Sequence, residues 1–306
     1  GPDAIFEASL QVDLLHQEFP GLWKLGIFMD KAPEHWTTKG EEYKQKAETI
    51  IQALENGEQI ESNSKLVENL NSINTACAQL KNELAERTKY WIAKGKKVIL
   101  LGGDHSTPLG YYEALTSIHD SFGILHLDAH MDLRNAYEGF TYSHASIMYN
   151  ALKLPELSKL VQVGIRDFCE EEHQVVKNQG ERVTVFTDRD MKAKAFDGMT
   201  WKEQCDVVID LLPQKVCISF DIDALSPLYC PNTGTPVPGG LSFEQATYLL
   251  SRLAESDKEV IGIDLVEVAP GEDGWDGNVG SRILFHLCGV LAKSQKLNVG
   301  TPISFC

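Results

Sequence analysis

Short apolar runs alternate with helical patterns along most of this chain, and this alternation constrains the fold more than any other feature. The first run, KVILLGG, ends in glycines, which is typical of a buried strand in a parallel sheet. The runs cover residues 97–103, 122–128, 159–165, 182–187, 215–223 and 259–268.

Helical patterns, with apolar residues three and four positions apart, precede the first run and separate most of the others. The patterns cover residues 41–54, 64–93, 106–118, 143–153, 201–212, 242–255 and 280–293. The long segment 64–93 fits one helix or two. Strands that alternate with helices of this length predict βαβ units, so we expect a parallel sheet with helices on both faces. The length of 306 residues fits one large α/β domain or two smaller ones.

Acidic residues and histidines gather where the predicted strands end. In LHLDAHMD, His126, Asp128, His130 and Asp132 occupy every second position after an apolar run. An isolated buried carboxylate costs more free energy than an apolar side chain returns, so something must neutralise these groups. Further polar residues follow other strands, namely His105, Asp221, Asp223 and Glu267, and His144 stands at the start of a predicted helix. The carboxyl edge of an open parallel sheet is where such folds build their sites.

This set of side chains predicts a site for two metal ions. Carboxylates with one or two imidazoles suit hard or borderline divalent ions, and no cysteine joins them. In an extended segment alternate side chains share one side, so we expect Asp128, His130 and Asp132 to converge, as well as Asp221 and Asp223. Four aspartates bring a charge of −4, which two divalent ions balance. Two ions about 3.5–4 Å apart are a recurring arrangement in hydrolases.

Each motif has a simpler interpretation when it is taken alone. A lone GGDH segment is more often a loop, and Asp221 with Asp223 could cap a turn. His144 could lie on the surface of a helix. The joint placement of these residues at neighbouring strand ends is what favours the metal site.

Composition restricts the partners of the chain. The formal charge is −16, from 28 basic and 44 acidic side chains, which argues against a nucleic-acid partner. This charge is compatible with a small cationic substrate, although a solvated acidic surface explains it as well. No apolar run approaches the ~20 residues of a membrane span. The seven scattered cysteines suggest reduced thiols and a cytoplasmic location.

Three segments resemble the signature blocks of the ureohydrolase family, which contains arginases, agmatinases and formimidoylglutamases. They are GGDHS at 102–106, DAHMD at 128–132 and SFDIDALSP at 219–227. GPDAIFEAS at the start also resembles the family's early G-P-x-A-I-R segment, with Phe6 in place of the arginine. We therefore expect one ureohydrolase domain over residues 1–306, without the extreme N-terminal strand of the family, and a three-layer α/β/α sandwich.

The resemblance implies two Mn²⁺ ions and a hydrolytic reaction. His105, Asp128, Asp132 and Asp221 would hold one ion, and Asp128, His130, Asp221 and Asp223 the other. His144 matches the proton-shuttling histidine of the family, and Glu267 matches the glutamate that pairs with the substrate guanidinium. The products would be urea and an amine, or formamide and an amino acid. Family members usually form trimers or hexamers, so a homo-oligomer is expected.

The loops that choose the substrate differ from common family patterns. Arg134 follows Asp132 by two residues and, if it faces the pocket, would favour a carboxylate tail; a surface position is the alternative. Acidic residues at 272, 273 and 276 could instead attract a cationic tail. Trp275 could form an apolar wall of the pocket or lie in an oligomer interface.

We favour the hydrolysis of agmatine to urea and putrescine. The alternative is a guanidino-acid, guanidine or formimidoylglutamate hydrolase of the same family. Arginase activity is less favoured, because the chain lacks a recognisable loop for an α-amino acid. A metal-binding homologue without activity and a single-zinc deacetylase are the remaining hypotheses. The complete set of six ligands, together with His144 and Glu267, argues against the first. A single-zinc deacetylase should have fewer acidic ligands, and the number of bound metal ions would separate it from the favoured hypothesis.

Overall fold

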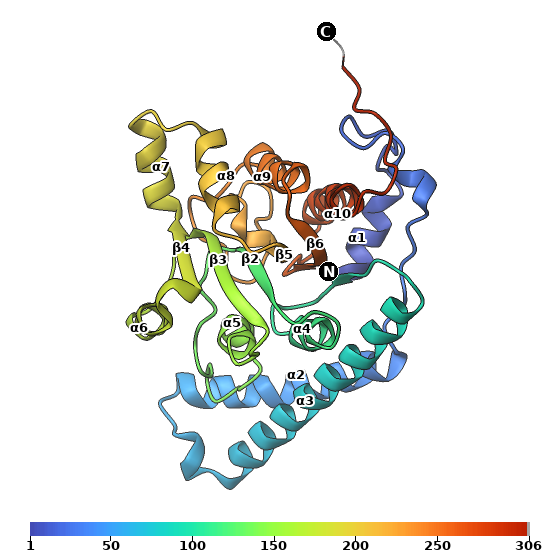
Figure 1. Cartoon of the computed structure of the whole chain (residues 1–306). Coiled ribbons are helices and arrows are strands. Elements are labelled where there is room, and N and C mark those ends of the chain that lie inside the picture. The colour runs from blue at the N-terminus through green and yellow to red at the C-terminus, as the bar shows by residue number, and fades with distance from the viewer. Residues whose placement is uncertain (305–306) are drawn as a thin grey trace.

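A six-stranded parallel sheet forms the centre of the protein (Figure 1), as the sequence predicts. The computed structural model describes residues 1–304. The strands are β1 Ile99–Leu101, β2 Phe122–Leu127, β3 Leu157–Ile165, β4 Val183–Thr187, β5 Lys215–Asp221 and β6 Glu259–Val266. Their spatial order is β1-β6-β5-β2-β3-β4, and every neighbouring pair is parallel. The carboxyl ends of all the strands therefore meet at one edge of the sheet.

Helices α8, α9 and α10 cover one face of this sheet (Figure 1). They span Trp201–Asp210, Phe243–Glu255 and Trp275–Ser294. Leu249 and Ile283 from this layer are fully buried in one apolar cluster with side chains of the central strands. This cluster is the larger of the two that flank the sheet, and it holds the strands that carry the acidic residues in place.

Helices α4, α5 and α6 cover the opposite face (Figure 1), which completes the three-layer sandwich. They span Leu109–Thr116, Ile147–Ala151 and Glu170–Gln179. Tyr112 of α4 and Phe122 of β2 belong to the apolar cluster of this face.

Two long helices, α2 (Glu34–Glu55) and α3 (Ser64–Ala93), form a pair that lies outside this second layer (Figure 1). Segment 64–93 is a single helix, and the Asn63 side chain caps its start by accepting a hydrogen bond from the Lys65 N–H (3.1 Å). The pair has an apolar cluster of its own around Ile50, Ala53, Leu66 and Ile73. Helix α3 also packs against α4, which connects the pair to the rest of the fold.

Three helices were not predicted: α1 (Pro2–Ser9), α6 and α7 (Asp188–Phe196). Helices α6 and α7 carry few apolar residues, so they show no apolar stripe with a helical period. Local hydrogen bonds start them instead. Glu172 accepts the N–H of Cys169 (2.9 Å), and Thr187 Oγ1 accepts the N–H of Asp190 (3.1 Å).

The cysteines are free thiols in the part of the chain that the structure describes, and Cys306 lies outside it. Within residues 1–304, no helix combines the length and the apolar character that crossing a bilayer requires.

His286 of α10 makes the stability of this fold depend on pH. Its side chain is 3% exposed, and its Nε2 lies 3.1 Å from both Ser251 Oγ and the Thr247 carbonyl. Burial, together with the neighbouring His16, lowers the pKa of His286 to about 3. The unfolded chain takes up this proton near pH 6.5, whereas the folded chain does so only near pH 3. The stabilisation is therefore complete above pH 6.5 and is lost progressively as the pH falls towards 3.

We expect His286→Gln to reduce this loss, because glutamine keeps an N–H donor near the Nε2 position and does not titrate. The free energy of unfolding of the parent protein should fall by about 2 kcal/mol more than that of the variant between neutral pH and pH 5. Urea denaturation at the two pH values measures this difference. His173→Gln, in the exposed part of α6, is the control and should behave like the parent. An equal loss in His286→Gln would show that another group is responsible.

Candidate metal centre

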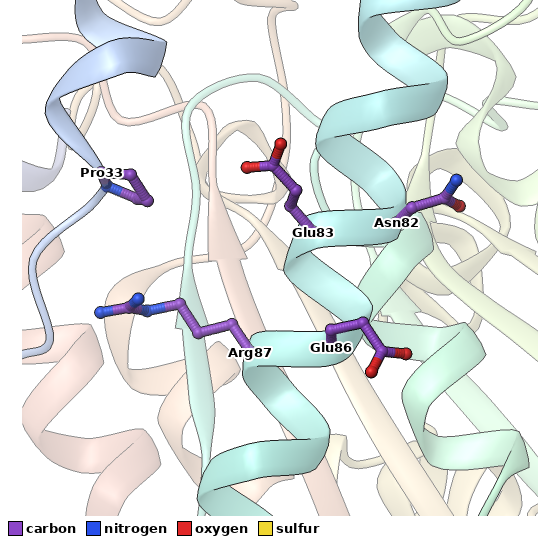
Figure 2. A pocket seen from close by; sticks show the side chains of 5 residues that line it. All are labelled: Pro33, Asn82, Glu83, Glu86 and Arg87. Carbon is purple, nitrogen blue, oxygen red and sulfur yellow. The ribbon is translucent and has the colours of Figure 1, made fainter.

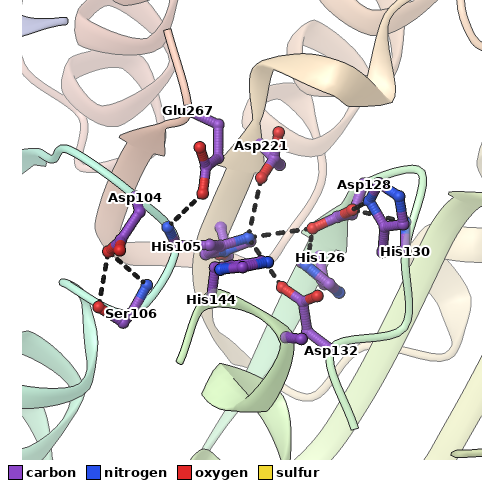
Figure 3. Close-up of polar contacts among 12 residues, drawn as sticks. Asp104, His105, Ser106, His126, Asp128, His130, Asp132, His144, Asp221 and Glu267 are labelled. Atoms are coloured by element: carbon purple, nitrogen blue, oxygen red, sulfur yellow. Dashed lines mark hydrogen bonds and ion pairs between the residues drawn. The ribbon is translucent and has the colours of Figure 1, made fainter. Parts of the chain in front are cut away.

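The predicted ligands come together at the carboxyl edge of the sheet (Figure 3). Leu127 of β2 pairs with Phe220 of β5, so the residues that follow, Asp128 and Asp221, lie side by side. His105 comes from the loop after β1, whose neighbour in the sheet is β6. Residues that follow the edge strand β1 and the central strands β2 and β5 thus meet at one site, as parallel sheets of this kind allow.

The His105 imidazole is the centre of the first group of ligands. Its Nδ1 lies 3.0 Å from Asp128 Oδ2, 3.1 Å from Asp132 Oδ2 and 3.1 Å from Asp221 Oδ2 (Figure 3). The side chain is 1% exposed, and Nδ1 makes no hydrogen bond of good geometry with the residues described. A buried nitrogen that faces three carboxylate oxygens without a hydrogen bond is the arrangement expected around a cation.

His130 is the centre of the second group. Its Nδ1 lies 3.0 Å from Asp223 Oδ2 and 3.4 Å from Asp128 Oδ1. Asp128 therefore offers one oxygen to each histidine group, which is the arrangement of a carboxylate shared by two ions. Two groups of side chains are compact enough to hold a metal ion each: His105, His126, Asp128 and Asp132 on one side, and Asp128, His130 and Asp223 on the other. The first group includes His126, which was not predicted as a ligand. The predicted ligand Asp221 belongs to neither group, although its Oδ2 lies 3.1 Å from His105 Nδ1.

Two divalent ions fit these residues by spacing and by charge. Adjacent ligands of an octahedral ion with bonds of about 2.1 Å lie about 3.0 Å apart, which matches the separations around His105 and His130. Burial and the neighbouring carboxylates raise the pKa of Asp132 to about 7 and that of Asp221 well above its usual range. The carboxylates of Asp132 and Asp221 are thus repelled by their acidic neighbours when no cation is present, and cations would relieve this repulsion.

The turns after β2 and β5, rather than extended segments, bring the aspartates together. Asp132 has a φ of 55°, and residues Ile222–Ala224 form a 3₁₀ turn. The prediction that alternate residues of an extended chain make these groups converge is therefore wrong. Asp221 Oδ1 accepts the N–H of Asp223 (2.8 Å), so the turn-capping role considered for this pair is present together with the clustering.

Glu267 and His144 both border the cluster (Figure 3). Glu267 Oε1 accepts the backbone N–H of His105 (2.8 Å), and the residue has a φ of 62°. Burial and the nearby Asp104 raise its pKa to about 7. His144 begins a 3₁₀ turn, and burial lowers the pKa of its imidazole. Glu267 and Asp132 are held in a backbone conformation that is unfavourable for residues other than glycine, which is common at functional sites.

A buried network behind His105 was not predicted. His105 Nε2 lies 2.8 Å from Ser219 Oγ, and Ser219 donates to Asp264 Oδ1 (2.9 Å). The Tyr112 hydroxyl donates to Asp264 Oδ2 (2.8 Å), and burial raises the pKa of Asp264 to about 6. Such partners orient a ligating imidazole. The sequence does carry a signal for this network: Ser219 and Asp264 are polar residues within the apolar strands β5 and β6.

A second network fixes the orientation of Asp128. The Gln162 amide nitrogen lies 2.7 Å from the Met131 carbonyl and 2.9 Å from His126 Nδ1. The Met131 carbonyl can only accept, so the group of Gln162 that faces it is the NH₂ group. The same NH₂ group faces His126 Nδ1 and donates its second hydrogen to that nitrogen. His126 then carries its proton on Nε2 and donates it to Asp128 Oδ2 (2.8 Å). The sequence shows His126 in step with Asp128, but its role depends on a residue of β3.

The structure does not bring Arg134 or Trp275 into contact with the cluster. Arg134 Nε lies 4.0 Å from Glu172 Oε2, and its guanidinium stacks 5.3 Å from the centre of the Tyr137 ring. Trp275 is 43% exposed and donates its Nε1–H to the Leu228 carbonyl (3.1 Å). The predicted helix 280–293 begins earlier than expected, so that Trp275 is the first residue of α10 and not part of a loop.

Arg166 and two glycines hold the segment after Asp223 close to the site. Arg166 Nη2 donates to the carbonyls of Asp223 (2.7 Å) and Val237 (3.1 Å). Gly239 and Gly240 have φ values of 104° and 90°, and a Cβ at Gly240 would lie 2.8 Å from the backbone of Leu225. Only glycine permits this close approach without strain.

Two surface hollows lie along α3, apart from the cluster. The larger, of about 430 Å³, is lined by Arg87, Tyr90 and Trp91. The other, of about 390 Å³, is lined by Pro33, Asn82, Glu83, Glu86 and Arg87 (Figure 2). Asn82 and Glu86 point away from Pro33 in this view, so the polar groups do not converge on one point. The metal cluster is therefore the better candidate for a functional site.

Comparisons with known proteins identify the family of the chain. A family profile described as the arginase family matches residues 1–289. N(1)-aminopropylagmatine ureohydrolase of Thermus thermophilus is 35% identical over 196 residues, which cover 64% of this chain and 63% of that protein. Agmatinase of Halalkalibacterium halodurans is 35% identical over 182 residues, which cover 60% and 59%. The crystal structure of agmatine ureohydrolase of Thermoplasma volcanium has a TM-score of 0.61 at 26% identity and covers 72% of this chain and 71% of that one. The chain thus spans about 63% of the length of the first of these relatives.

Proposed function

The chain belongs to the arginase family, and from this premise we propose that it is a two-metal hydrolase of small linear guanidino compounds. The observation that carries the proposal is the placement of Asp128, whose two oxygens face two separate histidine groups. The proposed ions are two Mn²⁺ per chain. His105, Asp128, Asp132 and Asp221 would hold one ion, and Asp128, His130, Asp221 and Asp223 the other. Such a pair of ions supplies a nucleophile from water near neutral pH.

Glu267 would orient the guanidinium group of the substrate. One of its oxygens already accepts the His105 N–H, and this contact fixes the carboxylate. The other oxygen, Oε2, faces Gly234. A Cβ added to Gly234 would lie 3.8 Å from Oε2 and would meet no nearer atom, so the space beside this oxygen is open. A carboxylate and a guanidinium form directional, charge-assisted hydrogen bonds. A cationic substrate would also favour the ionised form of Glu267, whose pKa burial raises to about 7.

His144 would carry the proton that the leaving amine requires. Burial lowers the pKa of the imidazole, so the neutral form that can take up a proton predominates at neutral pH. The neutral imidazole would take up a proton from solvent and pass it to the amine as the C–N bond breaks, which returns the ring to its neutral form. Urea and an amine are the products for a guanidino substrate.

Agmatine is the substrate that we favour, with putrescine as the second product. Its support comes from the agmatinases and the aminopropylagmatine ureohydrolase among the relatives, and from the net charge of −16. Arg134 supports a second candidate, a guanidino acid. Arg134 Nε lies 4.0 Å from Glu172 Oε2, which is a long ion pair and leaves the guanidinium able to bind a substrate carboxylate.

Self-association is also part of the proposal, as a trimer or hexamer in the cytoplasm. Large apolar side chains are exposed in the segment between α1 and α2, which supports burial against another copy. They include Leu10, Leu14, Leu15 and Phe28.

Product release across a panel of compounds tests the proposed function. Protein loaded with Mn²⁺ would be incubated with agmatine, arginine, guanidinobutyrate, guanidinopropionate and guanidine, and urea would be measured. Formamide release from formimidoylglutamate would be followed in parallel. Urea from agmatine, which disappears after chelation and returns with Mn²⁺, is the expected result. No product from any compound, in protein that holds two ions, would support the inactive homologue instead.

Arg134→Ala separates the two substrate candidates. With agmatine we expect kcat/KM to stay within about twofold, since no contact to the cationic tail is lost. If a guanidino acid is the substrate, the loss of a charged partner should lower kcat/KM by about tenfold or more. Arg189→Ala, at an exposed position of α7, is the matched control. A large rise in KM for agmatine would contradict the favoured substrate, whereas a fall in kcat alone would report the lost packing of Arg134 on Tyr137.

A further inference from the structure

A tight hairpin precedes His144 in the chain. Tyr137 and Phe140 exchange two backbone hydrogen bonds, of 3.2 and 2.8 Å. The two residues between them, Glu138 and Gly139, have φ values of 53° and 84°. Positive φ at both central residues is the feature of a two-residue hairpin turn of type I′. Residues 137–140 are called the hairpin below.

Asparagine side chains from two helices clamp the end of this hairpin. Asn74 of α3 donates to the Gly139 carbonyl (3.2 Å) and accepts the N–H of Thr141 (3.0 Å). Asn150 of α5 donates to the Thr141 carbonyl (2.9 Å). Both backbone groups of Thr141 are therefore paired with side chains. Asn74 ties α3 to the hairpin through Gly139 and to the residue that follows it through Thr141.

Apolar packing also fixes the hairpin on α2 and α3. Phe140 packs against the cluster that contains Ile50, Leu66 and Ile73. A Cβ at Gly139 would lie 2.8 Å from Leu70 Cδ2, so the hairpin backbone touches α3 directly. Helices that precede the sheet in the sequence thus determine where the hairpin lies.

Tyr137, the first residue of the hairpin, contacts His144. The rings of Tyr137 and His144 are 5.8 Å apart, with an angle of 63° between their planes, which is an edge-to-face arrangement. Within the described part of the chain, the one hydrogen bond to the His144 ring comes from Ser143 Oγ, at the long distance of 3.5 Å. This hydrogen bond is too long to fix the imidazole by itself, so ring packing on Tyr137 is a second constraint on its orientation.

We propose that Tyr137 is a positioning residue for His144, and that Asn74 of α3 holds Tyr137 in place. This inference rests on the proposed function, in which His144 moves a proton during turnover. A proton donor must lie within hydrogen-bond reach of the leaving group, and a displacement of about 1 Å can cost on the order of a hundredfold in rate. The α2–α3 pair then contributes to catalysis although it contains none of the proposed ligands.

Kinetics of three variants test the inference. Tyr137→Ala and Asn74→Ala should each lower kcat by about tenfold to a hundredfold, with KM within about twofold and the Mn²⁺ content unchanged. Tyr137→Phe keeps the ring and should keep kcat. Asn71→Ala, exposed on the same helix, is the control for Asn74. An increase in KM alone would overturn the inference, because Tyr137 would then bind the substrate and would not position His144.

A measurement without turnover separates this inference from the proposed function. Diethyl pyrocarbonate modifies imidazoles, and peptide mass spectrometry can follow its reaction with His144. We expect faster modification in Tyr137→Ala and Asn74→Ala than in the parent and in Tyr137→Phe. An unchanged rate would overturn the positioning role even if the enzyme is active. Faster modification in a protein without hydrolase activity would support the contact and reject the proposed function alone.

Discussion

Asp128→Asn is expected to remove both the bound metal and the catalytic activity. The two oxygens of Asp128 face His105 and His130, so one substitution affects both groups of ligands. An asparagine has a single oxygen and no charge, and its amide group would place N–H donors where a cation should lie. Activity should fall to the background rate, a loss of at least about 10⁶-fold. Metal analysis after gel filtration, combined with urea release, measures the two effects.

Asp120→Asn is the matched control, because this carboxylate is exposed after α4. It should keep two Mn²⁺ ions and full activity. Circular dichroism would show whether Asp128→Asn keeps the fold. Retention of both ions by a folded Asp128→Asn protein would disprove the role of Asp128 as a shared ligand.

His144→Ala is expected to separate catalysis from metal binding. The imidazole makes no ion pair with the cluster among the residues described, so the Mn²⁺ content should not change. Removal of a proton-transfer group typically costs about 10²–10⁴-fold, and this loss should appear in kcat. Steady-state kinetics with the preferred substrate of the panel measure it. Added imidazole should restore part of the activity, since the vacated space admits a small base.

Exposed His173 of α6 provides the control substitution, which should leave kcat unchanged. If His144→Ala loses its metal, the residue acts as a ligand and its proposed role in proton transfer is wrong. If kcat is unaffected, another group supplies the proton.

The alternation of strands and helices made the architecture predictable. A buried parallel strand is a continuous apolar run, and each of the six runs became a strand within a few residues of its predicted limits. Helices α6 and α7 were not predicted because they have no apolar stripe. Hydrogen bonds to Glu172 and Thr187 cap their first turns instead. The spatial order of the strands, which places β5 beside β2, is a long-range property that no local pattern contains.

The six predicted ligands lie together because parallel strands deliver their ends to one edge, and their roles as ligands stay a prediction. The groups that support them depend on contacts across the sheet. His126 gains its donor role from Gln162, and His105 is oriented through Ser219. The anchoring of the hairpin by Asn74 spans 65 positions along the chain. Hydrogen bonds between distant segments leave no periodic trace in a sequence.

The small apolar cluster around Ile50 and Ile73 determines which part of the protein would unfold first on heating. It is separate from the two clusters that flank the sheet, and it supports the hairpin beside His144. Small apolar units open at a lower free-energy cost than the core of a domain. Warming would therefore release the hairpin while the sheet and its aspartates stay intact. Turnover would cease reversibly, at a temperature below that of global melting.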